Sequence, residues 1–66
     1  MNVNLNGATR SLMDDATVAD AAALLDVRPG RGVAVAVNGE VVPRGEWGRR
    51  LREADHVEIL RASQGG

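Results

Sequence analysis

The residues with the clearest potential for chemistry are the last ones of the sequence, which closes on Gly65 and Gly66 after Ser63 and Gln64. Glycines have no Cβ, so such a terminus could enter a narrow channel that a side chain would obstruct. Four extended residues reach about 13 Å, enough to carry a carboxylate away from a domain surface. A terminal carboxylate is ionised at pH 7 and resists nucleophiles. It would need activation, most simply as an acyl-adenylate, before a thiol, persulfide or amine could attack it.

The rest of the sequence supplies few groups that could carry out this activation. There is one His, and there is no Cys or Lys, so a set of nucleophile, base and orienting group can hardly be assembled. His56 has no set of ligands near it in the sequence, which argues against a zinc site. We therefore expect that the chain is not an enzyme, that it binds no metal or cofactor, and that a partner activates Gly66.

Length and composition limit the remaining possibilities. A chain of 66 residues is one domain with a small core. The longest apolar runs are the five residues 21–25 and 33–37, too short for a secretory signal or a membrane span. We expect a cytoplasmic chain that contacts no membrane. The net charge of −1 and the pI of about 5.7 argue against nucleic acid as a partner.

Two Asn-Gly pairs predict two β-hairpins, because Asn and Gly tolerate the positive φ angles of a type I′ turn. These pairs are Asn6-Gly7 and Asn38-Gly39. The first would join residues 1–5 to residues 8–13, and the second would join residues 33–37 to residues 40–42. Residues 1–5 alternate between apolar and polar, which is typical of a strand with one solvated face. Residues 33–37 are apolar throughout, which predicts burial on both faces.

One helix is predicted between the hairpins. Thr17 and Asp20 have the spacing of a capping box. The apolar positions that follow form a single stripe. They are Val18, Ala21, Ala22 and Leu25. We expect Pro29, Gly30 and Gly32 to end the helix and to form a loop.

The last third of the sequence predicts one short helical turn and one strand. Trp47 and Leu51 are four residues apart, as on one turn of helix, and residues 56–61 alternate as a strand does. Hairpin, helix, hairpin, turn and strand together favour an α+β fold of two layers. We predict a β-grasp (ubiquitin-like) domain, with a mixed sheet of four to five strands and one main helix across one face. A ferredoxin-like fold would need a second full helix, for which the region after Pro43 is too short.

These elements divide the chain into a β-grasp domain, residues 1–62, and a flexible diglycine tail, residues 63–66. On the final strand, Leu60 lies on the face opposite Val57 and Ile59, and it would be a docking site if that face is uncovered. Arg61 is a candidate to pair with acids of an activating enzyme.

The other conspicuous side chains favour structural roles. Trp47 is interpreted as packing partly against the domain, being the largest apolar group available. Arginines 44, 49, 50 and 52 form a local basic cluster, which we interpret as a solvated face.

Several segments of the chain resemble one family of proteins. They are Val35-Ala36-Val37-Asn38-Gly39-Glu40-Val41-Val42-Pro43-Arg44, then Trp47, Asp55, the final strand and Gly65-Gly66. This pattern resembles the ThiS family of thiamine-biosynthesis sulfur carriers over the whole chain. The stretch V-V-P-R-x-x-W is distinguishing, because many ubiquitin-like proteins end in two glycines. Ala62, Ser63 and Gln64 are more polar than is typical at these positions of the family.

The resemblance implies a cycle of reactions on Gly66. A ubiquitin-activating-like adenylyltransferase, which binds ATP, would convert its carboxylate to an acyl-adenylate. Sulfur that originates from a cysteine desulfurase would then give a thiocarboxylate, and thiazole synthase would use that sulfur. Ser63, Gln64 and Gly65 would lie in a partner's channel, and the chain would be a monomer when not bound to a partner.

Three other functions are compatible with the same sequence. A molybdopterin-type sulfur carrier has a similar fold and terminus, although it is usually longer and richer in Phe. A covalent protein modifier would use the same tail to form isopeptide bonds. A plain β-grasp interaction module would carry the diglycine incidentally.

Overall fold

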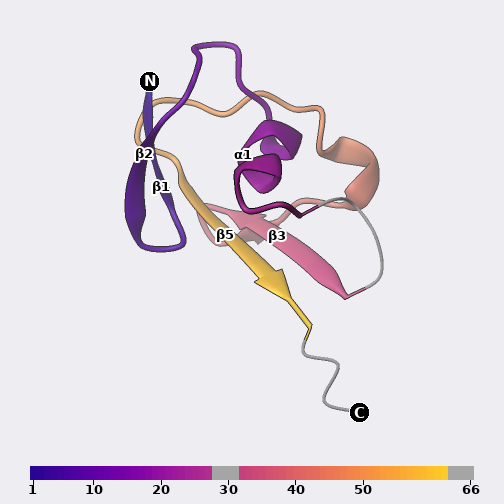
Figure 1. Ribbon diagram of the computed structural model, residues 1–66. Coiled ribbons are helices and arrows are strands. Elements are labelled where there is room, and N and C mark those ends of the chain that lie inside the picture. Colours follow the sequence, from indigo (N-terminus) through magenta and orange to yellow (C-terminus); the bar gives the residue numbers. More distant parts are fainter. Residues whose placement is uncertain (28–31, 63–66) are drawn as a thin grey trace.

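Five strands and one helix make up the part of the chain that the computed structural model describes, residues 1–27 and 32–62 (Figure 1). The elements are β1 (Asn2–Leu5), β2 (Ala8–Ser11), α1 (Val18–Leu24), β3 (Val33–Val37), β4 (Glu40–Val41), the 3₁₀ turn η1 (Arg44–Glu46) and β5 (His56–Arg61). The strands form one sheet in the order β2-β1-β5-β3-β4. Strands β1 and β5 are parallel and the other neighbours are antiparallel. This mixed sheet with one helix across it is the predicted β-grasp fold.

Both predicted hairpins are confirmed. Leu5 pairs with Ala8 and Val37 pairs with Glu40, so each loop has two residues. The φ angles of the loop residues are all positive, as a type I′ turn requires. They are 50° at Asn6, 88° at Gly7, 51° at Asn38 and 86° at Gly39.

The capping box at the start of α1 is also confirmed. The backbone N–H of Asp20 donates to Oγ1 of Thr17 at 3.2 Å, and the N–H of Thr17 donates to Oδ2 of Asp20 at 2.9 Å. The first N–H groups of a helix have no partners within the helix. Here the N–H groups of Val18 and Ala19 donate to carbonyl groups of the segment 47–51. This segment therefore completes the cap of the helix.

The helix ends earlier than predicted. It stops at Leu24, before Pro29 and Gly30, which lie outside the described residues. Asp26 adopts the left-handed conformation, with φ of 61°, and its N–H donates to the carbonyl of Ala23 at 3.0 Å. The N–H of Val27 donates to the carbonyl of Ala22 at 3.0 Å. These two bonds form a Schellman motif, which terminates a helix without the proline or glycine that we expected.

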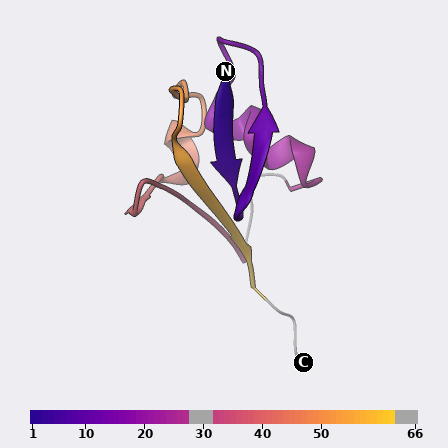
Figure 2. The same cartoon turned by 90° about the vertical axis from the view of Figure 1, so that its left-hand side faces the viewer.

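Strand β3 is covered on one face only, so the prediction of burial on both faces is wrong. Val35 and Val37 are buried, whereas Ala34 is exposed and Ala36 is half-buried. Figures 1 and 2 show α1 on one side of the sheet, and the described residues place no other element on the opposite side. A run of alternating Val and Ala is apolar at every position, and its sequence therefore does not show which face is covered.

The core lies between the sheet and the helix and includes Trp47. This side chain is 4% exposed, and its indole N–H donates to the carbonyl of Val42 at 3.2 Å. The predicted turn from Trp47 to Leu51 is wrong, because η1 precedes Trp47. Leu51 is buried by another arrangement: its N–H donates to the carbonyl of Ala16 at 2.9 Å. The backbones of Arg49 and Leu51 therefore bond to residues 16–18, at the start of the helix.

Candidate functional site

The strand that leads to the C-terminus lies in the middle of the sheet. Strand β5 pairs with β1 on one side and with β3 on the other. The β3 pairing runs from Val37 opposite Val57 to Val33 opposite Arg61, and the N–H of Ala62 donates to the carbonyl of Gly32. The position at which the chain leaves the sheet is therefore held by backbone bonds up to Ala62.

The predicted tail residues Ser63, Gln64, Gly65 and Gly66 lie outside the described residues.

Asn6, in the first turn, binds β5 through its side chain. Its Oδ1 accepts the N–H of Ile59 at 2.8 Å, and its Nδ2 donates to the carbonyl of Ile59 at 3.2 Å. The backbone N–H of Asn6 also donates to the carbonyl of Val57 at 2.9 Å. The amide thus takes the place of a peptide group and extends the β1–β5 ladder beyond the point where β1 turns away.

Asn38, in the second turn, binds the beginning of β5 in a similar way. Its Oδ1 accepts the N–H of His56 at 2.9 Å, and its backbone N–H donates to the carbonyl of His56 at 2.7 Å. Its Nδ2 donates to Oδ1 of Asp55 at 2.9 Å. These contacts have no signal in the sequence, because the turn by itself accounts for an Asn-Gly pair.

Leu60 lies on the uncovered face of the sheet, opposite the buried Val57 and Ile59, as its position in the strand predicted. Its side chain is 66% exposed. Leu60 is paired with Ala34, and Ala36 is paired with Val41, which is 71% exposed. We call Ala34, Ala36, Val41 and Leu60 the open-face strip. An exposed apolar surface of this kind, next to the strand that leads to the C-terminus, is suited to contact with a protein.

Arg61 lies on the other face of the sheet from Leu60. Its Nη2 donates to the carbonyl of Leu25 at 3.2 Å, at the end of α1. A cation is favourable there, because the last carbonyl groups of a helix lack partners and carry partial negative charge. Leu60 and Arg61, which we each predicted to contact a partner, therefore belong to opposite faces.

The described residues contain no group of three or more His, Cys, Asp or Glu side chains that could hold a metal ion. His56 borders a shallow hollow on the uncovered face, together with Asn4, Asn6, Glu58 and Leu60. Within residues 1–27 and 32–62, no helix has the length and apolarity needed to cross a membrane.

The fold and this site define a small ubiquitin-like β-grasp domain with one uncovered sheet face beside its C-terminal strand. The model of the ThiS family matches residues 3–66, and the chain belongs to this family. The resemblance found in the sequence is thereby confirmed.

Two solved structures from Geobacter metallireducens are similar to the chain. One is a crystal structure of the thiamine biosynthesis protein ThiS, with 29% identity, full coverage of both chains and a TM-score of 0.76. The other is a solution structure of a thiamine biosynthesis protein, with 30% identity and a TM-score of 0.78, covering 100% of this chain and 88% of that one. A comparison with curated proteins finds no match.

Proposed function

We propose that the chain carries sulfur in thiamine biosynthesis, as a thiocarboxylate on Gly66. The observation that carries this proposal is the ThiS family match, which runs to residue 66 and so includes both terminal glycines. The identity of 29–30% to the G. metallireducens thiamine biosynthesis proteins, over the whole of this chain, supports it.

We propose three chemical steps at the Gly66 carboxylate. A carboxylate oxygen attacks the α-phosphorus of ATP held by an adenylyltransferase, which forms the acyl-adenylate and releases pyrophosphate. The persulfide of a cysteine desulfurase then attacks the acyl carbon, which expels AMP and leaves Gly66 joined to the desulfurase through an acyl disulfide. A thiol, such as that of free cysteine, reduces this bond, which releases the thiocarboxylate and leaves a disulfide between that thiol and the desulfurase cysteine. Thiazole synthase receives the sulfur from the thiocarboxylate. The chain acts as a protein co-substrate, and its partners hold ATP and the catalytic groups.

The domain contributes a fixed exit and a docking surface. Hydrogen bonds from Asn6 and Asn38 hold β5, and Ser63, Gln64 and Gly65 bring Gly66 into the partner's channel. The open-face strip lies beside this exit, since Leu60 precedes Ala62 by two residues. We propose that the adenylyltransferase covers this strip while it holds the tail.

The direct test uses the full chain with ATP, the adenylyltransferase, a cysteine desulfurase and cysteine, followed by intact-mass measurement. We expect a mass gain equal to the replacement of one oxygen by sulfur, located at Gly66 by fragmentation. A chain that lacks Gly66 is the control. Conversion of the wild type that is no better than that of the control would refute the proposal.

The same samples separate the alternative functions. Stable conjugates to lysines of other proteins would indicate a covalent modifier. Complementation of a strain that requires thiazole is expected, and complementation of a molybdopterin-deficient strain alone would indicate the other class of carrier.

A further inference from the structure

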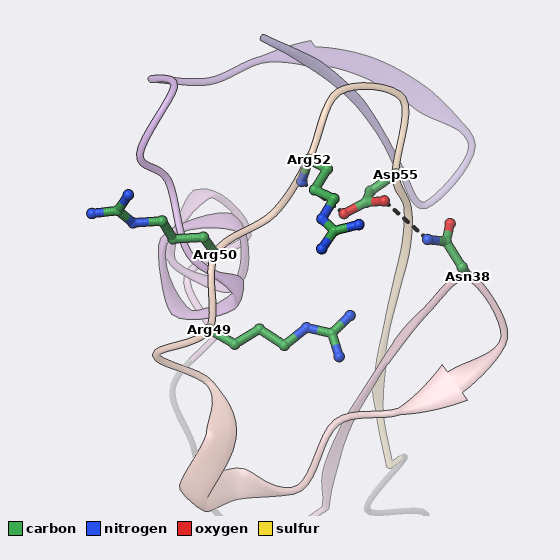
Figure 3. Close-up of a pocket in the computed structure, with 5 residues that line it drawn as sticks. All are labelled: Asn38, Arg49, Arg50, Arg52 and Asp55. Carbon is green, nitrogen blue, oxygen red and sulfur yellow. Dashed lines mark hydrogen bonds between the residues drawn. The ribbon is translucent and has the colours of Figure 1, made fainter.

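The charge of this chain is unevenly distributed. Residues 44–52 contain four arginines and one glutamate, a local charge of +3, so the remainder carries −4 if the whole has −1. Arg49, Arg50 and Arg52, which we call the arginine cluster, line an open hollow together with Asn38 and Asp55 (Figure 3). The cluster therefore forms a basic surface on an otherwise acidic domain.

The backbone that carries the cluster is held in place. Trp47 and Leu51, which are both buried, lie within this segment. The carbonyl of Arg49 accepts the N–H of Val18 at 3.0 Å, and Arg50 forms a β-bridge with Thr17. The arginines thus project from a fixed segment, and binding through them would cost little backbone entropy.

No carboxylate of the described residues forms an ion pair with the guanidinium groups of the cluster. Within residues 1–27 and 32–62 the only ion pair joins the N-terminal ammonium group of Met1 to Asp14. Asp55, which lines the same hollow, and Glu53 both accept hydrogen bonds from backbone N–H groups. Oδ2 of Asp55 accepts the backbone N–H of Arg52 at 2.8 Å, and Oε1 of Glu53 accepts the N–H of Asn2 at 3.0 Å. The guanidinium groups are therefore available to an external anion.

The chain's own C-terminus cannot be that anion. Asp55 precedes the first residue of β5 and Ala62 follows its last, so the strand separates them by about 23 Å. The four residues after Ala62 reach at most about 14 Å.

The arrangement of the cluster favours several carboxylates over one small anion. Figure 3 shows Arg49 and Arg52 directed into the hollow and Arg50 directed away from it. A single phosphate cannot contact all three guanidinium groups, whereas acidic side chains spread over a protein surface can. Arginine binds carboxylates through two parallel hydrogen bonds and is enriched in protein interfaces.

We propose that the arginine cluster is a second anchoring surface, which binds a carboxylate-rich surface of the adenylyltransferase while Gly66 occupies its active site. The proposal rests on the function proposed above. It gives the partner two contacts at opposite ends of β5, the tail with Leu60 at one end and the arginine cluster at the other. Two contacts so far apart would fix the orientation of the domain.

The test compares R49E, R52E and R49E/R52E with the wild type. Arg10→Glu, on the edge strand β2, is the matched single-charge control. The dissociation constant for the adenylyltransferase is measured at low and high salt, and the rate of thiocarboxylate formation is measured against chain concentration. We expect the double variant to bind at least tenfold more weakly at low salt, with a raised KM, an unchanged kcat and a smaller salt dependence.

The conservative variant R49K/R52K keeps the positive charges, so it should bind the adenylyltransferase with most of the wild-type affinity. A loss of affinity that came from misfolding would not be recovered by keeping the charges. Thermal unfolding of each variant is measured in parallel. Equal affinities of R49E/R52E and R10E would overturn the inference. The inference would also be overturned if inorganic phosphate shifted the NMR signals of the cluster while R49E/R52E bound the partner as the wild type does. That result would indicate a site for a small anion. If the wild type forms no thiocarboxylate, the proposed function fails, whereas normal conversion with an unchanged KM in R49E/R52E refutes the second anchor alone.

Discussion

At the scale of single residues, the two turn asparagines do more than allow a positive φ angle. Each uses its side-chain amide to hold the backbone of β5, Asn6 at Ile59 and Asn38 at His56. Asparagine is suited to both tasks, because its side chain both donates and accepts while its backbone tolerates the left-handed region.

Replacing Asn6 by Gly should separate these two tasks. Glycine keeps the turn geometry but removes both side-chain bonds to Ile59, so we expect the free energy of unfolding in urea to fall by about 1–2 kcal/mol. Asn6→Asp keeps the acceptor for the Ile59 N–H and should lose less. If N6G and the wild type have the same urea midpoint, the side chain does not stabilise β5.

Trp47 also combines packing with one specific hydrogen bond. Trp47→Phe should destabilise the domain by about 1–3 kcal/mol, because it leaves a small cavity and deprives the Val42 carbonyl of its indole donor. Thermal unfolding followed by circular dichroism measures this loss, since the variant has no other indole to follow by fluorescence. An unchanged melting temperature would contradict the described packing of Trp47.

At the scale of elements, the helix of seven residues depends on its cap. So short a helix is not stable alone, and its N-terminal N–H groups need partners. Thr17→Ala should lower the free energy of unfolding by about 1 kcal/mol, whereas Thr17→Ser should retain most of it. Thr9→Ala, on the exposed edge strand, is the control, and a larger loss for T9A than for T17A in urea unfolding would contradict the role of the cap.

For the uncovered face of the sheet, we predict that a substitution changes partner binding but not the stability of the domain. Leu60→Asp should leave the free energy of unfolding within about 0.5 kcal/mol, because the side chain is mostly exposed. It should nevertheless weaken binding to the adenylyltransferase by tenfold or more. Met13→Asp, also at an exposed apolar residue, controls for the general loss of apolar surface. Equal binding of both variants would exclude the open-face strip as the docking surface.

At the scale of the whole molecule, all buried residues of the core cluster lie between Val3 and Ile59. A chain that ends at Ala62 should therefore unfold at the same urea concentration as the full chain, yet form no thiocarboxylate. Equilibrium unfolding measures the stability of the shortened chain, and the mass assay measures its conversion to the thiocarboxylate. A clear loss of stability on truncation would show that residues 63–66 belong to the folded domain.

Much of the fold was predictable from local signals in the sequence. The two turns, the capping box and the limits of β5 each depend on a few adjacent residues whose backbone preferences are strong. Their order along the chain then favoured one two-layer arrangement. The family pattern around V-V-P-R-x-x-W and the terminal Gly65-Gly66 likewise belongs to the sequence alone.

The tertiary structure decided which faces and which partners these residues meet. The sequence of β3 does not show which of its faces is covered, because alanine and valine are both apolar, and the position of the single helix settles it. Alternation along a strand already places Leu60 and Arg61 on opposite faces. Only the structure shows that the face of Leu60 is uncovered and that Arg61 reaches the carbonyl of Leu25. The hydrogen bonds from Asn6 to Ile59 join segments that only folding brings together. Folding likewise brings Asn38 to the hollow that Arg49, Arg52 and Asp55 line. Contacts between distant segments leave no local signal, and they are what the structure adds.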